Sequence, residues 1–367
     1  MLKLKELLRG AGSLSAVILF GSVLVGCGSG GGTDNIICGG DCSSSSDEDE
    51  LSVADSDGFT FGADLYNPES YNINNVEVKI TIGLNDFEGN PPPDGTIVLF
   101  DAEAGTIPSQ CELVSGQCTV TWLSGDPRPG YGPNPMGEID GRFIIFARAL
   151  GAESFTDLNN NNRFDGISEE PFIDLPEPFL DINENGVYDF GEEFEDSPGG
   201  TDGVYDYADG LYNGPRCNAD CSDASSIYVG GTYELGSYTF VMSTSSAYIW
   251  DSGDAEILRD YTAISGNALP AANTTIDISG GAIYFNDVFV GDGFGNSMAS
   301  GTTVAISASN VNVSGTLSYT FRDTQIAAQY MPFTLQTDGV SGADGELKIT
   351  ITAPSGLVSE YTWPVTD

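Results

Sequence analysis

The stretch GNPPPDGTIVLF, residues 89–100, combines a Gly/Pro-rich turn with a strand-forming run. The same arrangement returns 206 residues later as GNSMASGTTVAI, residues 295–306, where Gly, Asn, Gly, Thr and Val match at five of twelve positions. Each copy is preceded by a segment of alternating apolar and polar residues, 76–84 in the first case and 282–290 in the second. Self-similarity at a fixed offset predicts two copies of one β domain.

Short strand-like runs continue on both sides of the repeat, without helical periodicity between them. Residues 142–148, for example, read RFIIFAR, and residues 346–352 read ELKITIT. Such runs, bounded by turn clusters, are typical of antiparallel sandwiches. We therefore predict an all-β fold with two antiparallel β-sandwiches, over residues 51–152 and 226–367. Residues 229–250 are expected to form strands that lead into the second sandwich.

The first copy carries a set of residues at fixed spacing: Asp86, Gly89, Asn90, Pro91, Gly95, Thr96, Val98 and Phe100. This set resembles the bacterial Ig-like domains of the invasin and intimin type. The second copy departs from the resemblance at Ser297, where the first copy has a proline. The resemblance implies seven-stranded sandwiches that present or space something at a cell surface, and it implies no catalysis.

The composition excludes several classes of function. The chain of 367 residues has 54 Asp and Glu against 12 Lys and Arg, no histidine, and a formal net charge of −42. Without histidine there is no Ser-His-Asp or Cys-His catalysis, and no imidazole ligand for zinc or haem. The charge argues against nucleic acid as a partner, because phosphate binding needs clustered Lys and Arg.

The N-terminal residues have the pattern of a lipoprotein export signal. Basic residues precede an apolar run over residues 11–26, which is too short to span a bilayer comfortably. The run ends in LVGC at Cys27, and this resembles the lipobox of bacterial lipoproteins, whose cysteine is lipidated. We expect residues 1–26 to be the signal peptide and residues 27–50 a lipidated, flexible Gly/Ser-rich and acidic tether to the membrane. By the same resemblance, Gly28 indicates the outer membrane of a Gram-negative-type bacterium, facing the periplasm or the surface.

Six cysteines remain besides Cys27, an even number that indicates disulfides in an exported protein. Six cysteines allow 15 pairings, but these fall in close local pairs. Three short bridges are therefore predicted: Cys38–Cys42, Cys111–Cys118 and Cys217–Cys221.

Between the two β blocks, residues 153–225 form an acidic segment whose spacing is ordered. From Glu153 to Asp209 it holds 17 acidic residues and one basic residue. An ordinary solvated charge run lacks order in its spacing. Here the motif E-x-F-x-D occurs four times, as ESFTD (153–157), EPFID (170–174), EPFLD (177–181) and EEFED (192–196). We expect its phenylalanines to supply a small apolar spine.

The third motif opens DINENGVYDFGE, residues 181–192, which has the spacing of an EF-hand-type calcium loop. Ca²⁺ takes six to eight hard oxygens, short side chains at alternate positions curl around it, and glycine at position 6 allows the sharp turn. The predicted ligands are Asp181, Asn183, Asn185, the Val187 backbone carbonyl, Asp189 and Glu192.

The first motif opens a similar loop whose closing acid is late. The loop DLNNNNRFDGISEE begins at Asp157, and Ser168 stands where a closing glutamate is usual. One inserted residue would bring Glu169 into that role. The predicted ligands are Asp157, Asn159, Asn161, Arg163 at the carbonyl position, Asp165 and Glu169. Weaker candidates, for a degenerate third site or a neighbouring shell, are Asp202, Asp206 and Asp209.

Pro171 and Pro178 disfavour the helices that flank a true EF-hand. The loops therefore resemble the helix-poor calcium repeats of extracellular proteins such as thrombospondins. This resemblance implies that bound ions replace a hydrophobic core. We expect Ca²⁺ to be a structural cofactor that stiffens the segment and holds the two sandwiches in a fixed geometry.

Three functions fit these observations, and we favour a non-enzymatic, lipid-anchored cell-envelope protein with structural or adhesive work and a protein or glycan partner. A carbohydrate-binding module could use Trp122, Trp250 and Trp363, although Trp122 and Trp363 are expected to be core residues. A glycoside hydrolase with paired carboxylates would not need histidine. Nearly all the clustered acids, however, are accounted for as calcium ligands.

Overall fold

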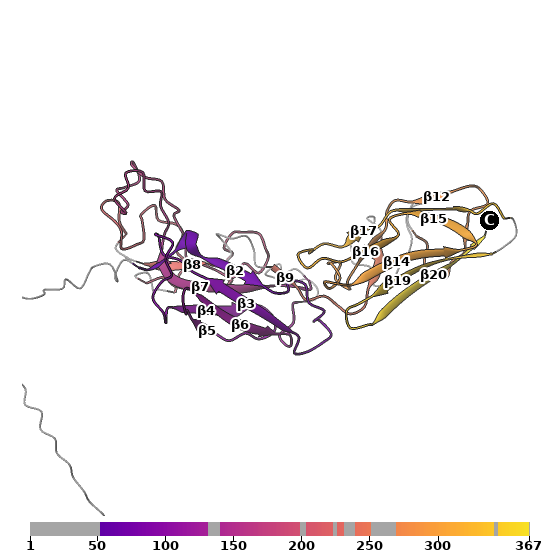
Figure 1. The fold of residues 1–367 in the computed structure, drawn as a ribbon, viewed down its shortest axis with the longest axis horizontal. Coiled ribbons are helices and arrows are strands. Elements are labelled where there is room, and N and C mark those ends of the chain that lie inside the picture. The colour runs from indigo at the N-terminus through magenta and orange to yellow at the C-terminus, as the bar shows by residue number, and fades with distance from the viewer. Residues whose placement is uncertain are drawn as a thin grey trace, which may run out of the picture. The chain divides into compact units, whose positions relative to one another are not determined.

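In the computed structural model, residues 52–130, 140–198, 203–222, 226–230, 239–250, 269–340 and 344–366 are described. Their regular secondary structure is β throughout, apart from one 3-10 turn, η1 (Ser56–Gly58). No helix in this part of the chain is long and apolar enough to cross a lipid bilayer. The strands form two sandwiches, each with its own buried core (Figure 1). The predicted all-β fold with two antiparallel sandwiches is confirmed.

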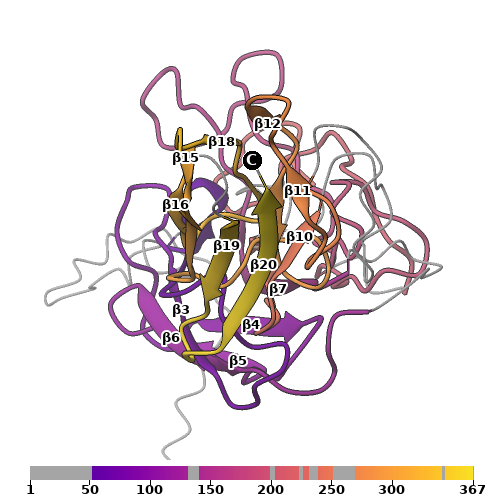
Figure 2. The same cartoon turned by 90° about the vertical axis from the view of Figure 1, so that its right-hand side faces the viewer.

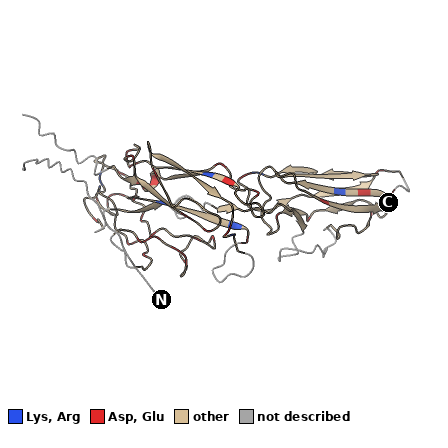
Figure 3. Ribbon diagram, turned by 90° about the horizontal axis from the view of Figure 1, so that it is seen from below, with Lys and Arg blue, Asp and Glu red and all other residues tan. Residues whose placement is uncertain are grey.

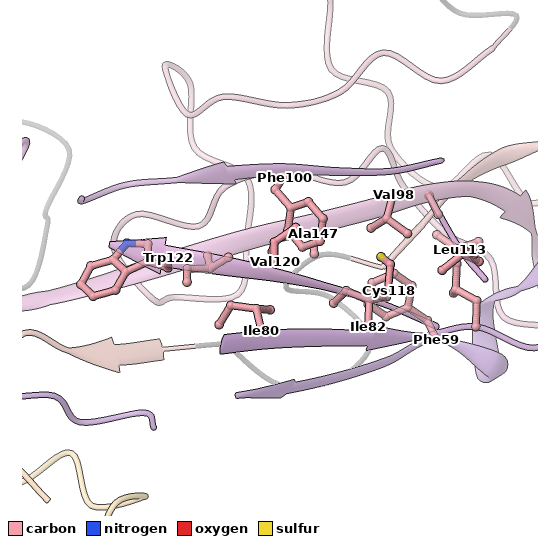
Figure 4. Close-up of a cluster of buried hydrophobic side chains, with 14 of the residues drawn as sticks. Phe59, Ile80, Ile82, Val98, Phe100, Leu113, Cys118, Val120, Trp122 and Ala147 are labelled. Atoms are coloured by element: carbon pink, nitrogen blue, oxygen red, sulfur yellow. The ribbon is translucent and has the colours of Figure 1, made fainter. Parts of the chain in front are cut away.

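The first sandwich packs a larger sheet against a smaller one. The larger sheet contains β1 (Ala54–Asp55), β4 (Ile97–Ala102), β5 (Gln110–Glu112), β7 (Arg142–Ala152), β8 (Ile227–Gly230) and β9 (Thr239–Val241). The smaller sheet contains β2 (Thr60–Ala63), β3 (Glu77–Gly83) and β6 (Gln117–Leu123). Strand β3 alternates strictly, so that Val78, Ile80 and Ile82 are buried and the residues between them are exposed. Ile80 and Ile82 point into the core formed with Val98, Phe100 and their neighbours (Figure 4).

The second sandwich follows the same principle with a five-stranded sheet and two three-stranded sheets. The larger sheet contains β11 (Ile276–Asp277), β14 (Thr303–Ser309), β16 (Ser318–Thr320), β19 (Gly345–Thr352) and β20 (Val358–Thr366). One smaller sheet contains β12 (Ile283–Phe285), β15 (Val311–Gly315) and β18 (Phe333–Thr337). The other contains β10 (Tyr248–Trp250), β13 (Phe289–Gly291) and β17 (Gln329–Tyr330). Figure 2 shows β19 and β20 side by side, as their antiparallel register requires.

The expected single strand over residues 282–290 is two short strands in the structure. β12 pairs with β18, whereas β13 pairs with β10 and β17 in a different sheet. Phe285, Val288 and Val290 all enter the same core, so the alternation shifts by one residue between Phe285 and Val288, where the chain changes sheet.

The two expected core tryptophans are buried, with 0% of each side chain exposed. The indole N–H of Trp122 donates to the Ala104 carbonyl at 2.7 Å, and that of Trp363 to the Pro270 carbonyl at 2.8 Å. Each core therefore buries a large ring without leaving its polar group unpaired.

Two of the three predicted disulfides are confirmed. Cys111–Cys118 joins β5 to β6, and Cys217–Cys221 closes a short loop in the acidic segment. Cys38 and Cys42 lie outside the described residues, as does the predicted lipidation site Cys27.

The predicted boundary at residue 226 is wrong. β8 and β9 lie beyond it, and both pair with β7 in the first sandwich. Phe240 and Met242 are buried in the first core, and of the described strands in 229–250 only β10 belongs to the second sandwich. An apolar pattern identifies a strand but not its partner, which is why the sequence did not show this. The acidic segment is an insertion in the connection from β7 to β8, rather than a linker that separates the two sandwiches.

The repeated turn has the same hydrogen bonds in both sandwiches. Asp86 Oδ1 accepts the backbone N–H groups of Glu88 and Asn90, at 3.0 and 2.8 Å. Asp292 Oδ1 accepts those of Phe294 and Asn296, both at 2.9 Å. Gly89 and Gly295 follow with φ of 81° and 83°, a region that favours glycine. The internal repeat thus extends to individual contacts.

Asp292 is fully buried, and burial raises its pKa to about 6, although three backbone N–H bonds and Arg142 oppose the shift. An unfolded aspartate has a pKa of about 3.9. The folded state therefore retains a proton that the unfolded state loses between these two pH values. The stability that this group contributes is fully present below about pH 4 and is lost as the pH rises through about 6.

We expect Asp292→Asn to reduce the loss of stability between about pH 4 and pH 6, because asparagine keeps an oxygen for two N–H donors and does not ionise. Urea unfolding of the wild type and the variant across this pH range measures the change in the free energy of unfolding. The exposed Asp277, whose pKa is lowered by hydrogen bonds from Ser279, provides the control. Asp277→Asn should keep the wild-type pH dependence in this window, and an unchanged profile for Asp292→Asn would contradict the assignment.

The place of β9 in the first core can be tested with Phe240→Ala. The Phe240 ring lies 5.2 Å from the ring centroids of both Phe143 and Tyr66. Truncating a buried phenylalanine costs about 3–5 kcal/mol. Hydrogen exchange should show lost protection in β3 and β7 while β14 and β19 keep theirs. Val340→Ala, at an exposed site, should change stability by less than about 0.5 kcal/mol.

Candidate metal centre

The insertion contains two lobes, each closed by a pair of E-x-F-x-D motifs. In lobe A, residues 153–174, Phe155 forms an antiparallel bridge with Phe172. In lobe B, residues 177–196, Phe179 does the same with Phe194. Each pair of motifs therefore brackets one of the two predicted calcium loops, which we call loop A (157–170) and loop B (181–192).

Each lobe has an aromatic core completed by a tyrosine from later in the chain. In lobe A, Phe155 and Phe164 pack on Tyr212 with ring centroids 5.5 and 4.9 Å apart. In lobe B, Tyr188 stacks on Tyr205 at 3.9 Å. The expected phenylalanine spine is present, and these tyrosines extend it.

Lobe B packs on the outer face of β7. Ile144 and Phe146 point away from the sandwich core and cluster with Leu180 of lobe B. Arg148, farther along the same face, is ion-paired with one acid on β4 and one in lobe B. Strand β7 is thus buried on both faces, which explains why RFIIFARALGA is almost continuously apolar.

In loop B, the carboxylates at both ends accept backbone N–H groups. Asp181 Oδ2 accepts from Gly186 at 2.7 Å. Glu192 Oε1 accepts from Ile182 at 3.0 Å, and its Oε2 from Asp189 at 2.8 Å. Only 3% of each of the two carboxylate residues is exposed. The opening and closing acids are therefore held in place by the loop's own backbone.

The side chains at positions 3, 5 and 9 of loop B meet at one point. The amides of Asn183 and Asn185 lie 2.8 and 2.7 Å from Asp189 Oδ2. These hydrogen bonds, that of Asn183 first, lower the pKa of Asp189. Val187, at position 7, donates its N–H to Asn185 Oδ1 at 2.7 Å. These contacts join the side chains at positions 3, 5 and 9 and tie position 7 to position 5.

Loop A repeats these contacts. The Asp157 carboxylate accepts the N–H groups of residues 159–162 at 2.7–3.2 Å. Although desolvation acts in the opposite direction, these bonds lower the pKa of Asp157. The amides of Asn159 and Asn161 lie 2.5 and 2.6 Å from Asp165 Oδ2. Position 7 is again bonded to position 5, since the N–H of Arg163 donates to Asn161 Oδ1.

In the structure, the buried acid that accepts backbone N–H groups at the end of loop A is Glu170, rather than the predicted Glu169. Glu170 Oε1 accepts the N–H of Leu158 at 3.0 Å, and its Oε2 accepts that of Asp165 at 3.1 Å. Glu192 binds the same two loop positions in loop B. Glu170 is 2% exposed, whereas the Glu169 side chain faces solvent. The available signal was the E-x-F-x-D motif, in which Glu170 and Glu192 hold the same place.

Four glutamates of the insertion are buried, one from each E-x-F-x-D motif: Glu153, Glu170, Glu177 and Glu192. Burial raises the pKa of Glu192 and Glu177, and their backbone N–H bonds oppose this. The ion pairs of the described residues do not include any of the four. Basic residues are few, and of those in the described ranges Lys79, Arg142, Arg148 and Lys348 lie on strands (Figure 3). Backbone donors alone therefore compensate these buried carboxylates.

Carboxylates do not by themselves form a metal cage here. Across the described ranges, no three or more Asp, Glu or Cys side chains are grouped as a metal shell. In loops A and B, asparagine and backbone oxygens would have to complete any shell, as they do in calcium sites.

Of the three weaker candidates, Asp206 and Asp209 lie in the described residues, and their printed contacts go to different groups. Asp206 donates its N–H to Glu177 Oε2 at 3.0 Å, in lobe B. Asp209 Oδ1 accepts the N–H of Leu211 at 2.7 Å, beside lobe A. Asp202 lies outside the described residues.

Arg142 connects loop B with the second sandwich. It donates to Glu184 of loop B at 3.2 Å and to Asn296 Oδ1 at 2.9 Å. Asn296 belongs to the repeated turn that Asp292 organises. The sandwiches also meet directly, since the Asn67 amide donates to the Met298 carbonyl at 2.6 Å.

No protein-family model matches this sequence, and no curated protein matches it. Among solved structures, the chain is similar to the D0–D1 domain of intimin, with 10% identity and a TM-score of 0.20, over 84% of this chain and 98% of that one. It is also similar to the Yersinia pseudotuberculosis adhesin InvE, with 11% identity and a TM-score of 0.23, over 86% and 60% of the two chains.

A third similar structure is the C-terminal fragment of intimin, solved with the intimin-binding domain of the translocated intimin receptor. The identity is 12% and the TM-score 0.27, over 83% of this chain and 62% of that one. The chain thus spans less than two thirds of the InvE and C-terminal intimin structures.

The docking of lobe B on β7 predicts a local effect for Leu180→Ala. Removing a buried leucine side chain costs about 2–5 kcal/mol. Because Leu180 contacts the outer face of β7, amide exchange should accelerate in lobe B and not in β3. Leu158→Ala, at a leucine that is 63% exposed in loop A, is the matched control and should leave exchange unchanged. Global loss of protection with Leu180→Ala would contradict a separate docking surface.

Proposed function

We propose that loops A and B bind Ca²⁺, and that the bound ions stabilise the insertion of a non-enzymatic, lipid-anchored cell-envelope protein. The observation that carries this proposal is the shared set of contacts in two loops of different length. In each, an opening aspartate accepts the N–H at position 6, and a closing glutamate accepts the N–H groups at positions 2 and 9. A loop held this way from both ends is preorganised for a ligand at its centre.

The donor set suits calcium. Ca²⁺ prefers six to eight oxygen ligands, whereas zinc prefers nitrogen and sulfur. A carboxylate oxygen that accepts one N–H keeps a second lone pair for a cation. Rotating the side-chain amides of Asn183 and Asn185 by about 180° about Cβ–Cγ would place Oδ1 instead of Nδ2 beside Asp189 Oδ2. Loop B would then offer oxygens from Asp181, Asn183, Asn185, Val187, Asp189 and Glu192.

Cations would also relieve the electrostatic cost of the insertion. The span from Glu153 to Asp209 has 17 acids and one basic residue. After burial, the neighbouring charges of Asp181 and Asp189 also raise the pKa of Glu192. A bound ion in the loop would remove this repulsion. Extracellular calcium modules bind with dissociation constants of about 10⁻⁴ to 10⁻³ M, and this is the range that a calcium titration of the chain must cover.

The wider role that we propose is structural or adhesive. Lipidation at Cys27 would hold the protein at the outer membrane, facing the periplasm or the cell surface, and the tether would let the sandwiches meet a protein or glycan partner. Support for this part comes from the lipobox-like sequence and the Ig-like resemblance.

Two other functions are less favoured. Trp122 and Trp363 are fully buried, so they offer no stacking platform for a carbohydrate. A glycoside hydrolase needs two carboxylates on either side of a sugar. The buried glutamates of the insertion instead accept backbone N–H groups.

Calcium titration of the full chain, followed by calorimetry and thermal melting, tests the proposal. Saturation at about 100 times the dissociation constant should add about 2.7 kcal/mol per site. Asp181→Ala and Glu192→Ala should each abolish binding at loop B. Absence of both heat and a melting shift in the wild-type chain would refute calcium binding.

A matched pair tests the closing acid of loop A. Glu170→Gln should lose one ion, because it removes the buried closing carboxylate, whereas Glu169→Gln should bind as the wild type does. The two variants have the same composition and net charge, so any non-specific effect of charge on calcium binding is the same in both. Equal binding by the two variants would exclude Glu170 from the site.

A further inference from the structure

The outer face of the larger sheet in the first sandwich is only partly covered. Lobe B packs on Ile144 and Phe146 of β7, and these side chains are 0% and 2% exposed. Farther along the same face of β7, Leu150 is 44% exposed. Beyond lobe B, apolar side chains of this sheet therefore face solvent.

The pairing of the strands shows that these exposed side chains are contiguous. β4 pairs with β7 so that Val98 lies beside Ala149, and both residues are in the core. Because side chains alternate along a strand, the next residues, Ile97 and Leu150, lie side by side on the outer face. Leu150 is paired on its other side with Tyr228 of β8. Ile97, Leu150 and Tyr228 thus form one row across three strands, which we call the outer row.

Acidic side chains border the outer row at both ends. Glu112 of β5 is paired with Ile97, at the edge of the sheet. Toward lobe B lies a pocket of about 320 Å³, which includes Arg148, two residues before Leu150 on β7. The pocket is lined by Asp101, Phe146, Arg148, Glu192, Glu193 and Phe194. Glu112 and Glu193 are exposed, and the ion pairs of the described residues include neither.

The pocket already contains a cation from this chain. The Arg148 guanidinium lies 4.5 Å from the centroid of the Phe146 ring, and it is ion-paired with Asp101 and Glu195. Carboxylates and aromatic faces are the groups that bind Lys and Arg side chains. The lining has three carboxylates and one guanidinium, so it favours a further cation. Its volume is at the lower end of the range for ligand pockets, about 300–1,000 Å³, which suits one long side chain.

Tyr228 connects the outer row with this charged region. Burial raises the pKa of Tyr228, the charge of Glu195 adds to the rise, and Arg148 opposes it. The phenol group therefore lies near the ion pair that joins β7 to lobe B. An occupant of the outer row would contact an apolar surface and charged groups together.

We propose that this face docks a basic segment of a partner protein, which places apolar side chains on the outer row and a Lys or Arg side chain in the pocket. The inference rests on the adhesive role in the proposed function, for which it names a class of partner, and it does not need calcium. Lobe B covers its half of the face in the same way. Leu180 packs on apolar residues of β7, and Glu195 supplies a charge opposite to that of Arg148.

Charge selects a basic partner over the other occupants of such a face. A second copy of the chain would carry the same formal net charge of −42, so the two copies would repel each other. An anionic lipid surface would be repelled for the same reason. A basic segment is attracted, and complementary charge across an interface favours both encounter and specificity. Contiguous exposed apolar side chains with a polar rim are typical of interaction sites.

Calorimetry of the full chain with a short synthetic peptide of alternating Leu and Lys measures docking. An all-Lys peptide of the same length reports attraction by charge alone, and a peptide of alternating Leu and Glu should not bind. Leu150→Thr should weaken binding of the Leu/Lys peptide about tenfold, because it removes the apolar contact at the centre of the row. Leu357→Thr, at a leucine that is 46% exposed in the second sandwich, should bind as the wild type does.

A second matched pair tests the pocket. Glu193→Gln should lower the association rate of the Leu/Lys peptide about threefold, because charges at the rim of an interface act mainly on association. Glu169→Gln removes the same charge from an exposed acid of loop A and should associate at the wild-type rate. Surface plasmon resonance measures both rates.

Four results would overturn the inference. Equal binding of the Leu/Lys peptide by the wild type, Leu150→Thr and Ile97→Thr would mean attraction by overall charge alone. Equal binding of the Leu/Glu peptide would exclude a basic partner. A dimer that Leu150→Thr abolishes would identify a second copy as the occupant, and loss of attachment to phosphatidylcholine vesicles in that variant would identify a lipid surface.

The calcium titration separates this inference from the proposed function. A chain that binds calcium but not the Leu/Lys peptide refutes the docking surface and leaves loops A and B intact. A chain that binds the peptide on the outer row but no calcium refutes calcium binding alone.

Discussion

Burial of β7 on both faces is the constraint on which the first sandwich and its insertion depend. Phe143 and Ile145 face the core, while Ile144 and Phe146 face lobe B. Both edges of the strand are also used, by β4 on one side and by β8 and β9 on the other. Strand β7 therefore contacts both the core and the insertion. Through the hydrogen bond from Arg142 to Asn296, it also contacts the repeated turn of the second sandwich.

In the insertion, buried glutamates rather than a large apolar core hold the backbone in place. Its apolar content is limited to small aromatic clusters, and buried glutamates join backbone segments that lie apart in the chain. A buried side chain that accepts N–H groups from two segments links them, and its removal would leave both donors unpaired. The shared role of these glutamates explains why the E-x-F-x-D motif recurs while the intervening lengths vary.

The sequence predicts local structure here better than long-range pairing. The alternation at 76–84 predicts β3, and the cysteine spacing predicts both described bridges, because these signals act between near neighbours. The partner of β9 depends on a strand about 100 residues earlier, which no local pattern records. Glu169 and Glu170 are chemically identical, so only the path of the backbone selects Glu170.

The meeting of Glu153 with Asn213 has a consequence for how this fold tolerates change. The chain leaves β7 and, some sixty residues later, returns to the point where it left. Loop-closure entropy rises only slowly with length, and contacts inside the insertion already offset it. The insertion therefore closes on itself where it leaves β7, and it also contacts that strand where lobe B docks on Ile144 and Phe146. A change in the length of the chain between Glu153 and Asn213 would therefore leave the register of β7 with β8 unaltered as long as lobe B keeps its contact with Ile144 and Phe146.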